Sequence, residues 1–462
     1  MLNTLNDVLN NVDNFIWGMP LIILILFTGI LLTVRLRGLQ IRHLGKALHY
    51  VFHNEDDGEG EVTSFGALCT ALSATIGTGN IVGCATAIVA GGPGALFWMW
   101  LAAFFGMATK YAEGMLAVKY RVIAEDGHAL GGPFYYIEKG MGKNFKWLAK
   151  LFCVFGTMVG LFGIGTFTQV NGITSAVNNF FDPSNVHTIS LFGMNYSISV
   201  VIIGGIKRIS KVSEVIVPFM AVTYIGVCLI IVFTHLPQVP AAFAEIVQSA
   251  FGLKAVAGGA IGAMTVAMQK GIARGIFSNE AGLGSAPIAA AAAQTNEPVR
   301  QGLVSMTGTF IDTIIVCTMT GLAIVMTGAW DMGLEGVAVT TKAFALGLPF
   351  PAKASAFVLM MCLVFFAFTT ILGWAYYSER CLEYLVNGKK FVITAFKWFY
   401  ILAVFIGPFM TVSAVWTIAD ICNGLMAFPN LVALLALNGD VVSETRGYLE
   451  RVGIVKTTVG EA

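Results

Sequence analysis

The chain has 462 residues, of which 56% are hydrophobic and 11% are charged, and its formal net charge is +1. Soluble domains are about a quarter charged residues, so this composition excludes an ordinary soluble enzyme and predicts a protein that crosses a membrane several times. A net charge this close to zero gives no sign of a nucleic-acid partner. The eight cysteines lack metal-ligand spacings, and we expect them to be packing residues.

Apolar runs of about 20 residues, the length that crosses the hydrocarbon core, recur along the chain. The first run lacks the basic segment that precedes a cleaved signal sequence, so we expect it to remain as a membrane helix. A short interfacial helix is expected at Pro240–Gly252. We predict eleven spans: Phe15–Val34, Phe65–Val89, Ala95–Val118, Trp147–Val170, Ile189–Ile206, Val212–Phe233, Ala255–Ala293, Leu303–Met326, Ala354–Leu385, Phe391–Phe409 and Val412–Leu437.

Lysine and arginine are concentrated in every second loop. They follow the odd-numbered spans, for example at Arg35–Lys46 and Lys119–Lys146. Since cytoplasmic loops carry an excess of these residues, we expect a multi-pass cell-membrane protein with its N-terminus outside and its C-terminus in the cytoplasm. An odd number of spans agrees with that orientation.

Two of the predicted spans contain residues that interrupt a helix. Ala74–Asn80 reads ATIGTGN, and Ala273–Pro287 reads ARGIFSNEAGLGSAP. In lipid, irregular backbone persists only beside protein or a water-filled cavity. Broken spans in corresponding positions of two halves point to the binding site of a secondary transporter. The sequence therefore predicts a small-solute site at these breaks.

The positions of the breaks also predict internal symmetry. With the first span set aside, ten spans remain, and one break opens each group of five. Because five is odd, the second group enters the membrane from the opposite side. The expected fold is all-α and integral to the membrane, with eleven transmembrane helices, a 5+5 inverted repeat, one extra N-terminal helix and two discontinuous helices.

The first break offers backbone groups and hydroxyls to a substrate. Gly77 and Gly79 let a ligand approach the chain closely, and the amides at a half-helix N-terminus favour a carboxylate. Thr75 and Thr78 would add hydroxyl ligands. The alternative is that the glycines only allow close packing between helices.

The second break supplies further candidate contacts, because a rise of about 1.5 Å per residue puts Gly271–Gly275 near mid-membrane. We expect released backbone carbonyls that accept a substrate ammonium, an amide side chain and two apolar walls. The alternative is a kink that only packs helices. The carbonyls are those of Gly271, Ala273 and Gly275, the amide is Asn279, and the walls are Ile276 and Phe277.

Lys270 and Arg274 share one helical face near the same depth. Charges inside a membrane are costly and usually face a cavity or a partner, and Asp312 and Glu280 are the candidate partners. Structural ion pairing is one interpretation. The other is that one of these cations takes the place of a bound sodium ion.

Two other spans carry candidate substrate contacts. The Gln169 amide has a donor and an acceptor, so it can meet both ends of a zwitterion, and Phe167 would form a nearby wall. Trp374 would close the pocket and limit the size of the substrate side chain. Interhelical hydrogen bonding and packing are the alternatives for these residues.

Several motifs together resemble those of the alanine or glycine:cation symporter family over nearly the whole chain. The resemblance implies the amino-acid–polyamine–cation transporter fold (LeuT type), sodium-driven uptake of small neutral amino acids, and a first span outside the two repeats. The motifs are Gly77–Ile81, Gly91–Ala95, Phe105–Glu113, Gly131–Pro133 and Ser278–Pro287.

The resemblance also implies a site for the co-transported sodium ion between the first and eighth core helices. Sodium prefers hard oxygen ligands, which the Thr369 and Thr370 hydroxyls and the carbonyls near Ser73, Ile76 and Phe366 would supply. Threonines in membrane helices also commonly bond their own backbone.

These expectations divide the chain into five parts. Residues 1–62 form an N-terminal accessory helix and a cytoplasmic loop, and residues 63–234 form the first five-helix repeat. An extracellular interfacial segment follows at 235–253, then the second repeat at 254–437 and a cytoplasmic tail at 438–462.

Three rival functions remain open at this point. Proton coupling would use Glu113, Asp312 or Glu280 as the titrating group. A channel would need a repeated filter loop or an acidic ring, and neither is evident. An enzyme would need a catalytic motif, but the chain has no HExxH, GxSxG or Walker-type loop.

Overall fold

The computed structural model describes residues 2–53, 58–124, 127–181, 205–252, 259–407 and 412–453. These residues are almost entirely helical. A short hairpin, β1 (Val122–Ile123) paired antiparallel with β2 (Ala129–Leu130), is the exception among named elements of the described chain. The all-α prediction is therefore confirmed.

The first part of the chain contains the N-terminal helices and the elements as far as residue 250. An N-terminal pair, α1 and α2, leads to two short helices and then to a helix that is interrupted near residue 77. The bounds are α1 (Leu2–Ile16), α2 (Met19–Arg35), α3 (Leu39–Arg42), α4 (Leu44–Phe52), α5 (Ser64–Thr75), η1 (Gly79–Gly83), α6 (Cys84–Gly91), α7 (Gly94–Lys119), α8 (Pro133–Tyr136), η2 (Ile137–Met141), η3 (Lys143–Phe145), α9 (Lys146–Phe162), α10 (Phe167–Phe181), α12 (Gly205–Thr234), η4 (Leu236–Gln238) and α13 (Val239–Ala250).

The second part begins with another interrupted helix and ends with a polar terminal helix. The bounds are α14 (Ala260–Asn279), α15 (Ala286–Ala290), α16 (Pro298–Thr309), η5 (Phe310–Cys317), α17 (Thr318–Thr327), η6 (Ala329–Asp331), α18 (Val337–Gly347), α19 (Ala352–Leu385), α20 (Lys390–Ile406), α21 (Val412–Ala436) and α22 (Asn438–Arg451).

Five stretches of the described chain are long and apolar enough to cross a membrane, and two bent helix pairs raise that number to seven. The bent pairs are Ser64–Thr75 with Gly79–Gly91, at 52°, and Asp420–Ala436 with Asn438–Arg451, at 57°. The chain is thus a multi-pass helical membrane protein. The number of eleven spans stays a prediction, and most of the predicted span Ile189–Ile206 lies outside the described residues.

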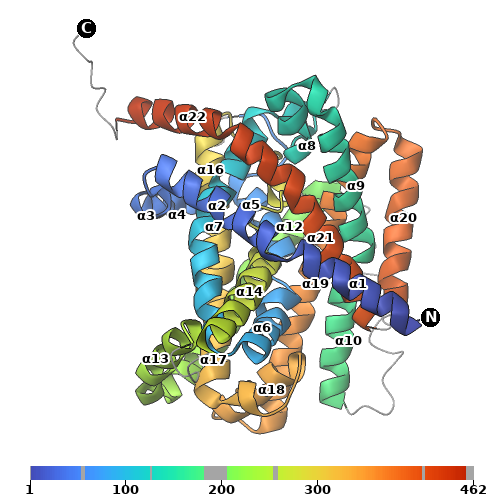
Figure 1. Ribbon diagram of the computed structural model, residues 1–462. Helices are drawn as coiled ribbons and strands as arrows, with labels where there is room; N and C mark the ends of the chain where they lie inside the picture. The colour runs from blue at the N-terminus through green and yellow to red at the C-terminus, as the bar shows by residue number, and fades with distance from the viewer. Residues whose placement is uncertain are drawn as a thin grey trace.

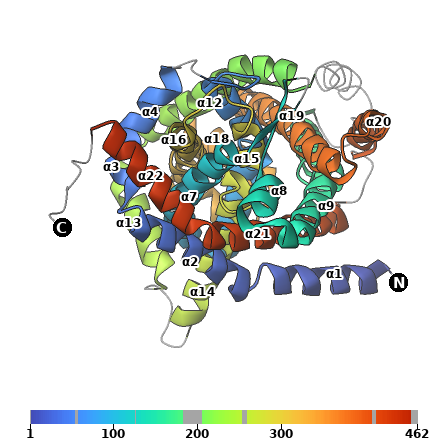
Figure 2. The same cartoon turned by 90° about the horizontal axis from the view of Figure 1, so that it is seen from above.

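The helices pack around α7, which contacts both α14 and α16 along its length. Figure 1 shows α22 at one end of the molecule and α13 and α18 at the opposite end. Seen along the perpendicular direction, α1 lies on the outside of the bundle beside α21, and α20 also lies at the periphery (Figure 2). All eight cysteines are buried and free, in agreement with a packing role.

Small residues allow the central helices to approach closely. A Cβ atom on Gly302 in α16 would lie 2.8 Å from the backbone oxygen of Tyr111 in α7, which is closer than real contacts allow. By contrast, Gly226 in α12 has no other atom within 4 Å of the same position.

We expect Gly302→Val to lower the free energy of unfolding by about 1–3 kcal/mol, because overpacking forces α7 and α16 apart. Thermal unfolding of the detergent-purified protein measures this change. The matched control is Gly226→Val, which should leave the midpoint nearly unchanged. Equal midpoints for both variants would contradict the close α7–α16 contact.

Candidate binding site at two helix breaks

The first predicted break is confirmed. Helix α5 ends at Thr75, Ile76 is extended with φ −76° and ψ 92°, and the chain turns by 52° before it continues through η1 into α6. Residues in this turn lose the helical partners of their amides. Side-chain oxygens replace those partners: the Gly77 amide donates to Asn80 Oδ1 at 2.9 Å, and the Thr78 amide donates to Gln169 Oε1 at 3.2 Å.

Gly77 is required at this break because other helices approach its backbone. A Cβ atom there would lie 2.4 Å from Thr370 Oγ1 and 3.2 Å from Gln169 Oε1. The missing side chain therefore lets polar groups of α19 and α10 approach the same unwound residue. Gly79 is likewise close to α14, since its Cβ would lie 3.2 Å from Ser278 Cα.

The second break lies further along the chain than we predicted. Helix α14 continues without interruption to Asn279, so the expectation that Gly271, Ala273 and Gly275 release their carbonyls is wrong. Gly271 and Gly275 serve packing instead: their Cβ atoms would lie 2.2 Å from Ala95 O and 3.4 Å from Met99 Cα in α7.

The helix stops where Glu280 adopts a left-handed conformation, with φ 57°. Gly282 and Gly284 follow with φ 90° and 81°, values that L side chains rarely adopt. The chain then re-enters a helix at α15. The break thus falls within the Ser278–Pro287 motif rather than at the preceding glycines.

Buried side chains also satisfy the backbone of this second break. Glu113 Oε1 accepts from the amides of Gly282 and Gly284 at 3.1 and 3.2 Å. Asn430 Nδ2 donates to Glu113 Oε1 at 2.6 Å and to the Gly282 carbonyl at 2.9 Å. The Lys110 ammonium donates to the Asn279 carbonyl at 2.8 Å, at the C-terminal end of α14 where a positive charge is favourable.

One buried carboxylate connects the two breaks. Asp312 in η5 accepts from Asn80 Nδ2 at 2.7 Å and from Ser278 Oγ at 2.9 Å. Asn80 also holds the Gly77 amide, and Ser278 immediately precedes Asn279. Two hydrogen bonds to one carboxylate therefore link the first break with the end of α14.

Some of the predicted sodium ligands lie close to one another at the first break. Thr370 Oγ1 is 3.4 Å from the Ile76 carbonyl and 3.0 Å from the Phe366 carbonyl, so groups of α5 and α19 meet at the first break. Thr369 Oγ1 donates to the Phe366 carbonyl at 3.0 Å, and Ser73 Oγ donates to the Thr70 carbonyl at 2.7 Å. Both threonine hydroxyls thus bond a carbonyl of their own helix, which was the alternative for threonine, and Thr370 in addition lies near the Ile76 carbonyl of the first break.

Of the predicted substrate contacts, Gln169 lies at the first break and Phe167 does not. Gln169 reaches Thr78, whereas Phe167 packs with Ala403 of α20 and Leu161. Two residues along a helix are about 200° apart, so Phe167 and Gln169 face different neighbours. The expectation that Phe167 forms a wall near the Gln169 contact lacks support in this geometry.

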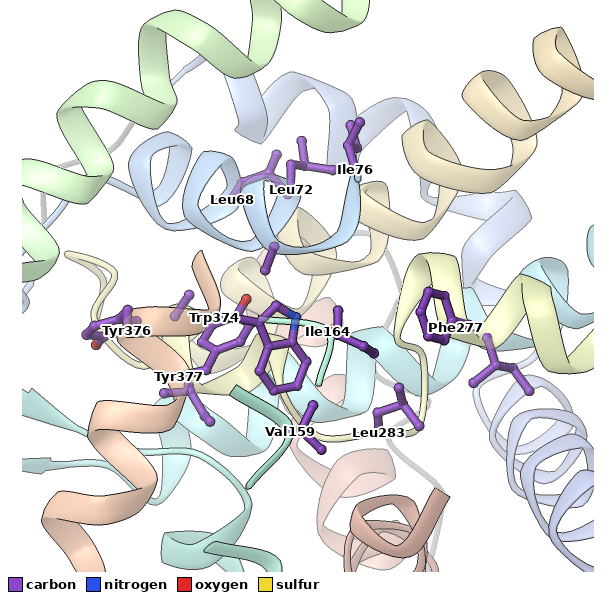
Figure 3. Close-up of a cluster of buried hydrophobic side chains, with 14 of the residues drawn as sticks. Leu68, Leu72, Ile76, Val159, Ile164, Phe277, Leu283, Trp374, Tyr376 and Tyr377 are labelled. Carbon is purple, nitrogen blue, oxygen red and sulfur yellow. The ribbon is translucent and has the colours of Figure 1, made fainter. Parts of the chain in front are cut away.

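Trp374 and Asn279 lie next to the second break. Trp374 Nε1 donates to Glu280 Oε1 at 2.9 Å. Its ring is perpendicular to that of Tyr377, in the buried cluster of Figure 3 that also includes Ile76 and Phe277. Asn279 Oδ1 accepts from the Ala281 amide at 2.9 Å. Ile276 is buried one turn earlier in α14.

The prediction that Asp312 or Glu280 is the partner of Arg274 in α14 is wrong. Its guanidinium lies 3.2 Å from Asp420 of α21. The cation beside those buried acids is Lys110, which we did not single out. A lysine three residues before Glu113 within an apolar span was the available signal.

The ends of the two broken segments meet at one end of the molecule. The Glu61 amide donates to the Ala292 carbonyl, and the Gln294 amide donates to the Val62 carbonyl, both at 2.8 Å. The Arg121 guanidinium, at the end of α7, donates to the carbonyls of Ala291, Ala293 and Thr295. Next to this closed end, a cavity of about 10 Å³ is lined by Thr75 and Lys110, which is room for about one water molecule.

A multi-pass helical protein with unwound segments at membrane depth, held by buried polar groups, belongs to the class of membrane transporters. The family model described as the sodium:alanine symporter family matches residues 2–459, and the chain belongs to that family.

Relatives of known or inferred function support the same class. The chain is 55% identical to an uncharacterized transporter of Haemophilus influenzae, with 98% of each chain covered. It is 47% identical to the sodium/alanine symporter AgcS of Methanococcus maripaludis, over 96% of this chain and 97% of the relative. It is 38% identical to the probable sodium/glutamine symporter GlnT of Bacillus subtilis, over 97% of this chain and 91% of the relative. These relatives are transporters, not enzymes.

Glu113→Leu should destabilise the protein, because it leaves the Gly282 and Gly284 amides of the second break without their acceptor and removes one of the two acceptors of Asn430. An unsatisfied buried donor costs about 1–3 kcal/mol. The Glu113→Gln variant retains an acceptor oxygen, so its stability should decrease much less. Thermal unfolding in detergent compares the two variants, and a Glu113→Leu protein as stable as the Gln variant would contradict this role.

Proposed function

We propose that this chain is a secondary transporter that couples sodium to the uptake of small neutral amino acids, alanine or glycine, by alternating access. The observation that carries the proposal is the convergence of Gln169 and Thr370 on two adjacent residues of the first break, Gly77 and Thr78. Membership of the sodium:alanine symporter family and the printed function of AgcS support it.

The proposed fold is the LeuT-type 5+5 inverted repeat, with eleven spans and an accessory first helix. Residues 63–234 and 254–437 would form the two repeats. The lysine and arginine distribution supports an external N-terminus and a cytoplasmic C-terminus in the cell membrane. The end closed by Arg121 would then face the cytoplasm.

The substrate carboxylate would bind the freed amides at Thr78 and Gly79 and displace the Gln169 oxygen that now occupies the Thr78 amide. A carboxylate is a stronger acceptor than a neutral amide oxygen, so the exchange favours binding. The displaced Gln169 would turn toward the ammonium. Asn279, Ile276 and Trp374 would bound the substrate on the side of the second break, with the Thr75 hydroxyl on the opposite side.

The sodium ion would bind between α5 and α19. Its ligands would be the Ile76 and Phe366 carbonyls and the Thr370 hydroxyl, with Thr369 and the Ser73 carbonyl as further oxygens. Thr370 already lies against Ile76, one residue before Gly77. The ion and the substrate would therefore order the same unwound residues, and binding of one would lower the conformational cost of binding the other.

The proposed cycle requires the closed end to open. Arg121 and the paired segments at 61–62 and 292–294 hold the inner ends of the broken helices together. Release of the substrate to the cytoplasm would require these bonds to break. Asp312 would carry changes at either break to the other.

Proton coupling is the second candidate, and one observation favours it. Glu113, Glu280 and Asp312 are all buried, with Lys110 as the nearby buried cation. Glu113 Oε2 has no hydrogen-bond partner among the described residues. Three buried carboxyl groups beside one cation would offer sites for a transported proton.

Uptake into proteoliposomes tests the function. We expect labelled alanine to accumulate when an inward sodium gradient is imposed at constant pH, and glycine to compete with it. Accumulation that requires a proton gradient and does not depend on sodium would contradict the proposal and support proton-coupled transport. Liposomes without protein are the control for leakage.

Thr370→Val should weaken sodium activation about tenfold, because a lost ligand worth about 1.4 kcal/mol changes an equilibrium by that factor. The sodium concentration for half-maximal alanine uptake measures this effect. The control is Thr341→Val, whose hydroxyl bonds only its own helix at the Val337 carbonyl. Unchanged sodium activation in the Thr370 variant would exclude this ion site.

Gln169→Ala should chiefly raise the alanine concentration needed for half-maximal uptake and leave sodium activation nearly unchanged. The reason is that Gln169 contacts the Thr78 amide and not the oxygens assigned to sodium. Uptake measured against both alanine and sodium concentration separates the two effects. Sodium activation weakened as much as in Thr370→Val would count against separate sites.

A further inference from the structure

A second cavity lies between the N-terminal helix α1, the broken helix α14 and α21. Its volume is about 50 Å³, room for about three to five water molecules, which is close to the heavy atoms of the smallest amino acids. Charged side chains dominate its lining: Asp13, Lys270, Arg274 and Asp420. The uncharged lining residues are Asn14, Trp17, Gln269, Ala273 and Phe277.

One pair of opposite charges in the lining is in direct contact, and the other two charged groups are not paired with each other by any contact in the described chain. Arg274 lies 3.2 Å from Asp420, whose backbone carbonyl accepts from the Trp17 indole at 2.8 Å. Asp13 contributes an inaccessible carboxylate oxygen, Oδ1, that has no hydrogen-bond partner within the described chain. Lys270 is exposed at the rim. The cavity thus presents two cationic and two anionic groups at short range.

The depth of the cavity indicates that water reaches it. Lys270 lies about 15 Å along α14 from the start of the helix, from a rise of 1.5 Å per residue. An exposed ammonium at this depth is costly against hydrocarbon and is found where a cavity is wet. A water-filled approach from the outer end of α14 satisfies this constraint.

One aromatic ring separates the cavity from the first break. Phe277 lines the cavity, and the Arg274 guanidinium lies 5.4 Å from the centre of its ring. On its other side, Phe277 Cδ1 is 3.4 Å from the position that a Cβ on Gly79 would take. A rotation of this ring would therefore connect the cavity with the first break at Gly79.

We propose that this cavity is a vestibule that binds a zwitterionic amino acid before it passes Phe277 to the central site. Lys270 and Arg274 would attract the carboxylate, and Asp13 and Asp420 would attract the ammonium. A ligand with one charge alone matches only half of this arrangement. The inference rests on the proposed function, since it takes the same substrate class, but it adds a second binding position on each chain.

Equilibrium dialysis of the full chain in lipid nanodiscs, with labelled alanine and saturating sodium, tests the vestibule. We expect two alanine molecules per wild-type chain at saturation and one in the Asp13→Asn, Lys270→Met double variant. Both changes leave the Arg274–Asp420 pair in place. The charge-exchanged variant, Asp13→Lys with Lys270→Asp, should restore the second molecule. Propionate and ethylamine, which carry one charge each, should not displace it.

The control variant, Glu335→Gln with Lys342→Met, removes the same pair of charges from exposed positions outside the cavity. It should bind two molecules. If the wild-type chain binds only one alanine molecule, the vestibule proposal is wrong and the proposed function is unaffected. The same holds if the Asp13, Lys270 double variant still binds two alanine molecules. Wild-type protein that binds no alanine would overturn the vestibule and the proposed function together.

Discussion

The structure depends on one constraint: backbone groups released at a helix break inside a membrane must find partners within the protein. At the first break, Asn80 and Gln169 accept from the amides of Gly77 and Thr78. At the second, Glu113 accepts from two glycine amides and Lys110 donates to the last carbonyl of α14. Each of these side chains is buried, although each is polar or charged.

This constraint explains why charged residues occur in the interior of so apolar a chain. A lone buried carboxylate would be strongly unfavourable, but Glu113 and Asp312 each accept hydrogen bonds from several buried donors. The acids and the unwound backbone therefore stabilise each other. Asp312 also connects the two breaks, since it accepts hydrogen bonds from Asn80 at the first break and from Ser278 next to the second. The two breaks behave as one polar unit inside an apolar bundle.

Such a unit is suited to alternating between states. A hydrogen bond to a neutral acceptor contributes about 0.5–1.5 kcal/mol net and one to a charged group about 1.5–3 kcal/mol, so the exchange of a side-chain oxygen for a substrate carboxylate would favour the bound state by a small amount. Bound ions and substrates shift populations only through such differences between states. The proximity of Thr370 and Gln169 to Gly77 is the physical basis of the coupled binding of ion and substrate that we propose for this member of the sodium:alanine symporter family.

Sequence alone determined the membrane class, the first break and the motif that contains the second, because hydropathy, glycine spacing and the Ser278–Pro287 residues are local properties. It misplaced the second break, because Gly271 and Gly275 weaken a helix in isolation but permit α14 to pack against Ala95 and Met99. Only the tertiary structure decided the partner of Arg274, the orientation of Phe167 and the role of Lys110. Those depend on which helices are neighbours, and the pairing of distant helices is set by packing of the whole bundle rather than by any local pattern.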